Sequence, residues 1–411
     1  MQRGLTISLF VSIALVASAC PAPKTATTPP PRGKSYDDYL KSGTKGARKK
    51  PANTNAKNAL WVHSIDIGQG AATLLEFPCG AVLVDTGGEK NKTFDGVKAL
   101  ISYLDTFFAR RTDLRKTIDL LAITHPHIDH TRGLQAVLQA YTIRNVIDNG
   151  SHRDDLGGRP QIAMHEWIAK KGQDVGHKDI RAADINPKTG MTDSIIDPIH
   201  GCGRSPVDPV ITAVWGSESR ELDSYGKNPN LHSVALRVEF GKSSVLITGD
   251  LEYAGISRLV KHTNPKLLDV DVYLVGHHGS KNATTSYLMK AMSPQVAVVS
   301  MSPYERREAW TARRFGHPHQ KAVGHLLHQE YGVSGKRAAM DVMIGVKGAW
   351  KEEKREVFRK QRLDKAVYAT GWDGHVVVKM NANGWIEVET AKKKPAAPPT
   401  AKKKPVAATA N

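Results

Sequence analysis

The chain has 411 residues, of which 40% are hydrophobic and 6% aromatic, and its formal net charge is +18. This composition suits one large globular domain or two ordinary ones. It excludes a protein with many membrane spans, because no segment beyond the first twenty residues is long and apolar enough to cross a bilayer. The positive surplus favours contact with a polyanion such as nucleic acid, anionic lipid or a phosphate-rich wall polymer, unless lysine-rich ends inflate the total and the folded part is only mildly basic.

The N-terminal segment has the pattern of an export signal. A short basic start at Arg3 precedes the apolar run 5–16, which is too short for a comfortable membrane span. Small residues then end in Cys20, so the pattern predicts a bacterial lipoprotein that a lipidated Cys20 anchors to a membrane, on the periplasmic side or at the cell surface. The alternative is an ordinary secretory signal that is cut near Ala19.

Both ends of the chain differ in composition from the part between them. Residues 21–58 are rich in Pro, Thr, Lys, Gly and Asn and lack apolar periodicity, which predicts a flexible tether. Residues 391–411 contain the string AKKKP twice, which predicts a disordered basic tail. The tail is either a solvated terminus or a means of electrostatic adhesion to a polyanion. Residues 59–390 are left as the folded domain.

In the first part of the folded domain, the apolar pattern of the sequence predicts a β-meander, a helix, a buried strand and a second helix, in this order. The expected elements span 60–67, 73–77 and 81–85 (strands), 94–108 (helix), 119–124 (strand) and 133–140 (helix). The buried strand would deliver His125 to a loop at its end.

In the rest of the folded domain, the sequence pattern predicts strand–helix units and two inserted segments. Strands are expected at 234–240 and 244–248 (a hairpin), 270–275 and 296–300, with a closing β-hairpin at 368–388. Residues 150–228 are irregular and are expected to form an insertion or lid. The highly charged residues 335–365 are expected to form a surface helical insertion. The pattern as a whole predicts an α/β fold with two sheets face to face and helices outside.

Three cysteines are present: Cys20, Cys79 and Cys202. If Cys20 is lipidated, Cys79 and Cys202 can pair as a disulfide in an oxidising compartment. The alternative is two separate buried thiols.

Four ligand-type side chains fall within six residues at His125, His127, Asp129 and His130. Imidazole nitrogens and carboxylate oxygens suit Zn²⁺, Mn²⁺ or Fe²⁺. On one tight loop, the first two side chains can point to one ion and the last two to a neighbouring ion. A His-rich surface loop is the alternative, but the cluster follows an apolar strand and is flanked by Pro126 and Gly133, which favours metal binding.

This cluster resembles the defining motif of the metallo-β-lactamase superfamily, and further landmarks occur in the family's order. They are Asp85 in LVDTGG, Asp250 in LITGD and the pair His277-His278 in VGHHGS. The strings DIGQG, FGHP and DGHVVV are similar to those of the ComEC-like branch of competence proteins. The resemblance covers about residues 60–390 and implies a metallo-β-lactamase αββα sandwich of two mixed β-sheets with helices outside.

The resemblance also implies roles for these residues. Asp85 would brace the metal loop, and Asp250 would bridge two ions. His278, directly before Gly279, aligns better with the family's last ligand, which would leave His277 as a neighbouring or substrate-contacting group, although either of the two can be the ligand. The implied cofactor is one or two Zn²⁺ or Mn²⁺ ions.

Two positions depart from the family pattern. Ala71 stands where the ComEC-like branch usually has Asp after the Gly-Gln-Gly turn. The family's third motif normally supplies a His before the strand at 234, and this chain instead has the pattern Asn-x-x-Ser from Asn230 to Ser233. His232 is nearby but out of register, so it is either a ligand or a hydrogen-bonding residue at the start of a strand.

The ligand set implies hydrolysis. Two cations sharing Asp250 and a solvent molecule would lower the pKa of that water to near neutrality and make it the nucleophile. Asp129 would orient the nucleophile or take a proton, with His277 beside it as a further catalytic group.

Three further residues are expected to contact an anionic substrate: Ser280, Lys281 and His317. Lys281 is either a point charge for a phosphate or an ordinary loop lysine. His317 belongs to a loop at the rim of the site, unless it forms another metal cluster with His319.

The resemblance and the basic charge favour an exported, metal-dependent phosphodiesterase or nuclease that acts on DNA. The fold alone does not decide the substrate. A β-lactam or small-ester hydrolase of the same fold is one alternative, and a tethered, non-catalytic nucleic-acid-binding protein is another.

Overall fold

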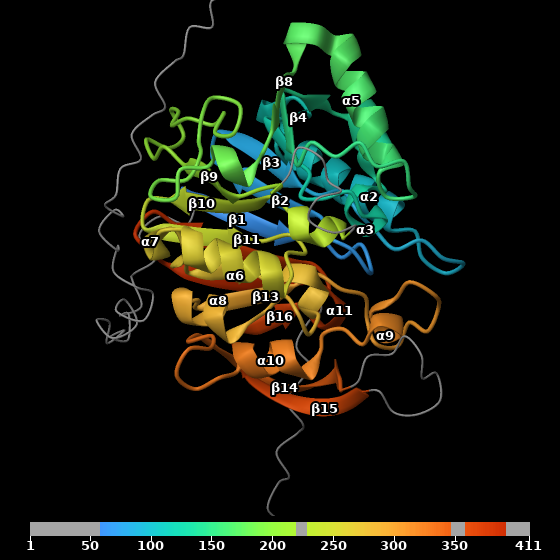
Figure 1. Ribbon diagram of the computed structural model, residues 1–411, viewed down its shortest axis with the longest axis vertical. Coiled ribbons are helices and arrows are strands. Elements are labelled where there is room, and N and C mark those ends of the chain that lie inside the picture. Colours follow the sequence, from blue (N-terminus) through green and yellow to red (C-terminus); the bar gives the residue numbers. More distant parts are fainter. Residues whose placement is uncertain (1–57, 219–227, 347–357, 392–411) are drawn as a thin grey trace, which may run out of the picture. The chain divides into compact units, whose positions relative to one another are not determined.

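The computed structural model describes residues 58–218, 228–346 and 358–391, and Figure 1 shows their helices and strands. The predicted signal with Cys20, nearly all of the predicted tether and the lysines of the predicted tail lie outside the described residues, so these expectations stay predictions. Within the three described ranges, no helix combines the length and the hydrophobicity that a membrane crossing requires.

Eight strands form the larger sheet, in the order β18-β17-β1-β2-β3-β5-β7-β8. The strands β1, β2 and β3 pair antiparallel, whereas β3, β5, β7 and β8 run parallel to one another. The closing hairpin β17–β18 pairs with β1, so the last strands complete the sheet beside the first one. The bounds are β1 (Ala59–Ser64), β2 (Thr73–Phe77), β3 (Gly80–Val84), β5 (Leu120–Ala122), β7 (Asn145–Asp148), β8 (Gly176–Asp179), β17 (Val376–Asn381) and β18 (Ile386–Thr390).

Six strands form the second sheet, in the order β16-β13-β12-β11-β10-β9. It repeats the plan of the first sheet: β9, β10 and β11 are antiparallel, and β11, β12, β13 and β16 are parallel. The bounds are β9 (Val210–Trp215), β10 (Ala235–Phe240), β11 (Ser243–Ile247), β12 (Val272–Leu274), β13 (Val296–Val299) and β16 (Val367–Ala369). A further small pair joins β4 (Thr117–Ile118) and β6 (Thr142–Ile143).

Helices cover the sheets, as the amphipathic pattern predicts. The long helix α2 and the helices α4 and α5 share one hydrophobic core with β2, β3, β5 and β7, in which Leu104, Leu134 and Met164 are buried. Figure 1 shows α6 and α8 lying across the second sheet, and these two helices contact each other. The bounds are α2 (Gly96–Arg110), α3 (Ile128–Thr131), α4 (Leu134–Ala140), α5 (Arg159–Lys171), α6 (Tyr253–His262), α7 (Pro265–Leu268), α8 (Ser286–Ala291), α9 (Ala312–Phe315), α10 (Gln320–Leu326) and α11 (Thr370–Asp373).

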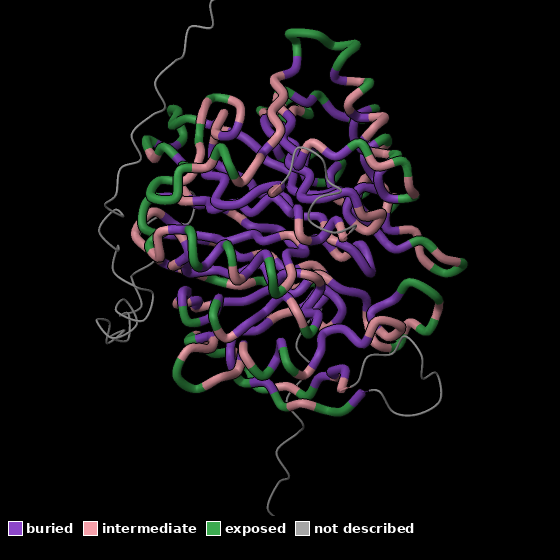
Figure 2. Tube along the Cα trace, viewed as in Figure 1, coloured by how far each residue is buried: buried purple, intermediate pink, exposed green. Residues whose placement is uncertain are grey.

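Hydrogen bonds link the two sheets at their ends. The amide of Lys242 donates to the carbonyl of Ala382, and the amide of Val234 donates to the carbonyl of Thr124. Figure 2 shows that most strand residues are buried and that the exposed residues lie on outer helix faces and loops. The predicted αββα sandwich is therefore confirmed, and so are the strand 73–77, the hairpin across Gly241 and the closing hairpin.

The prediction of a helical insertion at 335–365 was wrong. The described residues form an antiparallel pair, β14 (Lys336–Gly345) and β15 (Phe358–Lys365). Val342, Ile344 and Leu363 are buried against Val323 of α10, and the spacing of the first two is that of one face of a strand. The many charges in this segment hid the alternation.

The prediction of an irregular segment at 150–228 was also wrong in part. It contains α5, the edge strand β8 of the first sheet and the edge strand β9 of the second. The sequence of β8 is polar, and all four of its residues are half-buried, so it lacks the apolar signal of a strand. Residues 219–227 lie outside the described part.

Of the two alternatives for Cys79 and Cys202, the structure shows the disulfide. Cys79 and Cys202 are bonded, with 6.0 Å between their Cα atoms, and the bond closes a loop of 123 residues. It ties the turn between β2 and β3 to the segment before β9. Cross-links over such long loops stabilise a fold mainly by restricting the unfolded chain.

A buried charge cluster fastens α2 to the first sheet. The carboxylate of Glu76 on β2 accepts hydrogen bonds from Arg110 and Arg111 at 2.9 Å and lies 3.1 Å from Nε2 of His63 on β1. Burial alone would raise the pKa of Glu76, but the contacts with His63 and the two arginines lower it to about 2. The carboxylate is therefore ionised at neutral pH.

Replacing Glu76 with Gln should lower the free energy of unfolding by about 3 kcal/mol at pH 7, because the buried guanidinium of Arg111 loses one of its two charged partners and keeps only Asp113. The difference from the wild type should be complete above pH 4.5, the ordinary pKa of Glu, and should shrink as the pH falls toward 2. Urea unfolding at neutral and acidic pH measures both quantities.

The exposed Glu387 of β18 offers a matched control, and Glu387→Gln should change stability by less than about 0.5 kcal/mol. An equal effect of the two substitutions would show that the Glu76 cluster does not stabilise the fold.

Candidate metal centre

The carboxyl ends of parallel strands gather the candidate ligands. Asp85 follows β3 and His125 follows β5 in the first sheet, while Asp250 follows β11 and the pair at 277–278 follows β12 in the second. Open α/β sheets bind ligands at this edge. Asp85, His277 and His278 have positive φ values of 59°, 50° and 53°, which turn the chain sharply there. Such conformations are uncommon outside glycine and cluster at functional sites.

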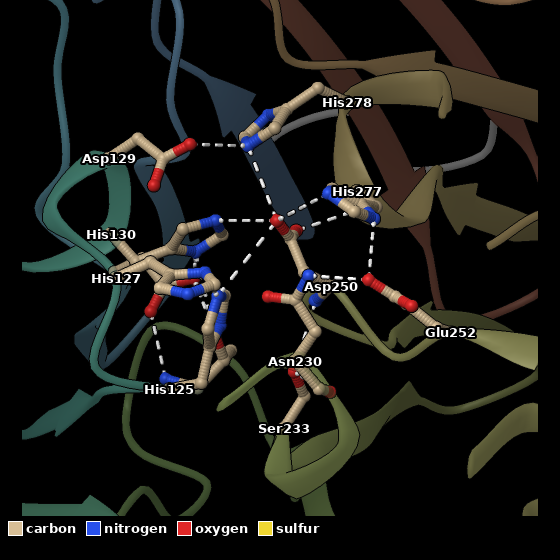
Figure 3. A network of polar contacts seen from close by, with 12 residues as sticks. His125, His127, Asp129, His130, Asn230, Ser233, Asp250, Glu252, His277 and His278 are labelled. Carbon is tan, nitrogen blue, oxygen red and sulfur yellow. Dashed lines mark hydrogen bonds and ion pairs between the residues drawn. The ribbon is translucent and has the colours of Figure 1, made fainter. Parts of the chain in front are cut away.

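Four side chains form the core of the site: Asp129, His130, Asp250 and His278. Each offers a ligand atom, and these atoms all lie within 4.8 Å of one another. Nε2 of His278 lies 3.2 Å from Oδ2 of Asp129 and 3.5 Å from Oδ2 of Asp250, and Nε2 of His130 lies 3.2 Å from the same Asp250 oxygen. Figure 3 shows the imidazoles converging on Asp250.

The free ring nitrogens of this core fit a cation. Nε2 of His130 and Nε2 of His278 are buried and have no hydrogen-bond partner. Nδ1 of His130 lies 2.7 Å from Asp85, and Nδ1 of His278 lies 2.9 Å from the carbonyl of Ser300. Because the Nδ1 protons are engaged there, each Nε2 can keep its lone pair for a metal. The donor set therefore fits a divalent ion.

The charges of the core also favour a cation. Burial alone would raise the pKa of Asp250, but His130, His278 and His277 hold it well below its usual value. Burial would likewise raise the pKa of Asp129, but His278 and His130 lower it. Burial would lower the pKa of His130, whereas Asp250 and Asp85 raise it well above the usual value. Two carboxylates, the buried Asp250 and the half-buried Asp129, are thus ionised, and a divalent ion bound here would displace the proton that the raised pKa holds on His130.

His125 and His127 lie beside this core. Nε2 of His125 lies 3.0 Å from Nδ1 of His127 and 3.9 Å from Oδ2 of Asp250. Burial lowers the pKa of both imidazoles, and His130 lowers them further. Neutral imidazoles are the form that binds a metal. Asp250 thus lies between two groups of imidazoles, which fits the expected arrangement for two ions, while the role of each ligand stays a prediction.

Asp85 supports the metal loop through contacts with Thr124 and His130. Its carboxylate accepts hydrogen bonds from the amide and the hydroxyl of Thr124 at 2.8 and 2.9 Å, in addition to its contact with His130. This geometry fits the bracing role that the sequence implied. Such outer contacts fix the ring orientation of a ligand.

The structure distinguishes His277 from His278. The side chain of His278 is 2% exposed and belongs to the four-residue core, whereas that of His277 is 20% exposed. The ring nitrogens of His277 lie 3.8 Å from Asp250 and 3.7 Å from Glu252. The geometry therefore favours His278 as the ligand and places His277 at the mouth of the site.

The three predicted substrate contacts differ in their position. The ring of His317 lies 5.9 Å from that of His277 and 6.1 Å from that of His278, so it borders the site. Ser280 is nearly buried, and its amide donates to the carbonyl of His277. Lys281 is exposed at the surface, where its carbonyl accepts a hydrogen bond from Tyr253.

The two departures from the family pattern have structural explanations. The backbone of Ala71 pairs with the metal loop, because its amide donates to the carbonyl of Asp129. His232 belongs to neither ligand cluster found among the described residues, and its Nδ1 lies 3.1 Å from the hydroxyl of Ser217. It therefore fits the expected hydrogen-bonding role at the start of a strand.

Sequence reasoning missed the residues that support Asp250 from the second sheet. The hydroxyl of Ser233 accepts a hydrogen bond from the amide of Asp250, and the amide group of Asn230 donates to Glu252 at 2.7 Å. The Asn-x-x-Ser pattern thus positions the Asp250 loop. The only feature of the sequence that could have identified Glu252 as a residue of the site is its position two residues after Asp250.

Known proteins resemble this chain over the same region. Residues 65–302, more than half of the chain, match the family model described as the metallo-beta-lactamase superfamily. ComE operon protein 3 of Bacillus subtilis (strain 168) is 28% identical over 281 residues, which cover 64% of this chain and 30% of the relative. Recombination protein 2 of Haemophilus influenzae is 25% identical over 283 residues, which cover 69% of this chain and 28% of the relative.

The match spans less than a third of the length of either relative. Among solved structures, the metallo-beta-lactamase fold protein YhfI of Bacillus subtilis is similar at 12% identity, with a TM-score of 0.28, and the match covers 53% of this chain and 70% of that one. This likeness is too loose for the two sites to be compared.

The assignment of His278 as ligand predicts different effects of two neighbouring substitutions. His278→Asn should weaken Zn²⁺ binding by more than about 100-fold, whereas His277→Asn should weaken it by less than about tenfold, as expected when a metal loses a ligand in one case and an outer contact in the other. Asparagine tolerates the positive φ of both positions. Zinc titration against a competing chromogenic chelator measures the two affinities, and the reverse order would make His277 the ligand.

Proposed function

The chain belongs to the metallo-beta-lactamase superfamily, and from this premise we propose that it is an exported, metal-dependent phosphodiesterase or nuclease that cleaves DNA. The superfamily fold serves several kinds of hydrolysis, so the fold does not decide the scissile bond. The observation that carries the proposal is the similarity to ComE operon protein 3 and Recombination protein 2, together with the ComEC-like strings of the sequence. Competence and recombination both concern DNA.

The buried ligand cluster gives this proposal its chemistry. One or two divalent ions, Zn²⁺ or Mn²⁺, held by the six side chains at 125, 127, 129, 130, 250 and 278 would polarise a phosphoryl oxygen and lower the pKa of a water. Oδ2 of Asp129 lies 3.2 Å from Nε2 of His278, so Asp129 is placed to orient a water at the site.

His277 and His317 have the position of substrate-contacting groups. The side chain of His277 beside Asp250 is 20% exposed, and its Nδ1 lies 3.7 Å from Glu252. Its Nε2 can then donate a hydrogen bond to a phosphate oxygen or a proton to a leaving alkoxide. Burial, with the imidazoles of His277 and His278, keeps the pKa of His317 well below its usual value, so His317 would contact the substrate as a neutral group.

Most of the net positive charge lies in two end segments, almost all of whose residues are outside the described part of the chain. Residues 21–58 contain nine basic and two acidic residues, and residues 391–411 contain six lysines and no acidic residue. These two segments account for 13 of the 18 net charges. We therefore propose that the lysine-rich tail, rather than the domain surface, holds the polyanion near the site.

The disulfide supports the exported location. Bonds such as Cys79–Cys202 persist in oxidising compartments and are rare in the cytosol. A lipid on Cys20 would then anchor the protein to a membrane, with residues 21–58 as the tether.

The proposal predicts that the purified full chain cleaves single-stranded DNA and a simple phosphodiester when Mn²⁺ or Zn²⁺ is supplied. His127→Ala and a chelator should each reduce cleavage to the background of the metal-free protein, because both remove the bound ion. Gel and spectrophotometric assays measure the two rates.

Replacing the exposed His262 of α6 with Ala is the matched control and should leave the rate unchanged. Turnover of a chromogenic β-lactam without DNA cleavage would refute the proposal in favour of lactam hydrolysis. Salt-sensitive DNA binding without any cleavage would favour a binding protein.

The role of the tail predicts a change in salt dependence. Replacing the six lysines of residues 391–411 with glutamine should reduce the slope of log affinity against log salt for single-stranded DNA by up to about 4, since each phosphate contact contributes about 0.7. Cleavage of the small phosphodiester should not change. An unaltered slope would show that the tail does not contact DNA.

A further inference from the structure

A second group of ligand-type side chains lies outside the centre described above. It consists of Asp148, His165, His177 and Asp179, whose ligand atoms all lie within 4.8 Å of one another. We infer that this cluster is a second metal site, which binds a divalent ion of the zinc class and fastens the edge of the first sheet.

Neighbouring elements place these side chains on one face of the sheet. β7 and β8 are parallel, with Asp148 opposite Asp179 and Val146 opposite His177. Residues paired across a parallel ladder share a face, and so do residues two apart in a strand. His165 comes from α5, which covers this face, because Gln161 and His165, one helical turn apart, both contact Asp148.

The distances suit a four-ligand site. Oδ2 of Asp148 lies 3.0 Å from Nε2 of His165 and 2.9 Å from Nε2 of His177, and the latter atom lies 3.6 Å from Oδ1 of Asp179. In a tetrahedral zinc site with bonds of about 2.0–2.1 Å, ligand atoms lie about 3.3 Å apart. Shifts of a few tenths of an ångström therefore admit the ion. Two imidazoles and two carboxylates suit borderline ions such as Zn²⁺.

The hydrogen bonds around Asp148 leave one of its carboxylate oxygens available to a cation. The residue is fully buried, and its Oδ1 accepts hydrogen bonds from Gln161 and from the amide of Gly150, which leaves Oδ2 for the imidazoles. A buried carboxylate requires a compensating partner, and a cation shared with the two imidazoles would supply one.

A four-ligand site made only of protein groups is typical of structural rather than catalytic zinc. It would connect β7, the edge strand β8 and α5. β8 in particular has no fully buried residue, so packing alone holds it weakly. The ion would supply the missing attachment.

Zinc stoichiometry of the purified full chain tests the site. After saturation with Zn²⁺ and desalting, the double variant His165→Gln/His177→Gln should hold one equivalent fewer than the wild type, as measured by mass spectrometry of the metal. The loss should add to that of His278→Asn, because the two sites are separate. His152→Gln is the matched control, since His152 is exposed and its ring lies 4.8 Å from that of His165 without belonging to the cluster.

Unchanged stoichiometry in the folded double variant would overturn the inference and leave a hydrogen-bonded cluster only. If the double variant does not fold, Asp179→Asn replaces it, because the Asp179 side chain is 32% exposed and its loss leaves no buried charge. Zinc should raise the melting temperature of the wild type more than that of Asp179→Asn. An equal rise would refute the site.

Discussion

The two sheets share one site through the carboxylate of Asp250. It lies at the end of β11 in the second sheet, and imidazoles reach it from both sheets, with His130 at 3.2 Å and His278 at 3.5 Å. An ionised carboxylate at this depth would be costly without such neighbours. The hydrogen bond from the amide of Val234 to the carbonyl of Thr124 fixes the spacing of the two loops. Metal affinity and the packing of one sheet on the other are therefore coupled at this point.

Both sheets reach the centre by the same route, since in each an antiparallel start is followed by parallel strands whose carboxyl ends carry the ligands. The second cluster obeys the same geometry, because Asp148 and Asp179 are the last residues of β7 and β8. The first sheet thus carries ligand groups along one edge, from the β3 loop to the β8 end. The group around Asp250 has a partly exposed imidazole, that of His277, beside it. The group around Asp148 consists of four protein ligands.

Much of this was predictable from sequence where a local pattern carries the information. Apolar runs identify the buried strands, and His125, Asp85 and Asp250 directly follow such runs. The choice between His277 and His278 was not settled by the sequence, because the two histidines are adjacent between two glycines and only the turn of the backbone decides which ring enters the core. Polar or highly charged strands were missed, as at 335–365 and in β8, since their apolar faces are too short to stand out. The second cluster joins three elements of a segment that was expected to be irregular.

The pairing of β1 with β17 delays the completion of the fold. Ala59 lies opposite Asn381, so the junction between β17 and β1 can form only after nearly the whole domain has left the ribosome. Contacts this distant in sequence form slowly, because the loop between them must close first. Until then β1 presents an unpaired edge that other strands can occupy. The rate of translation and the chaperones that shield this edge, more than the stability of the finished sandwich, would then set how much protein reaches the native state.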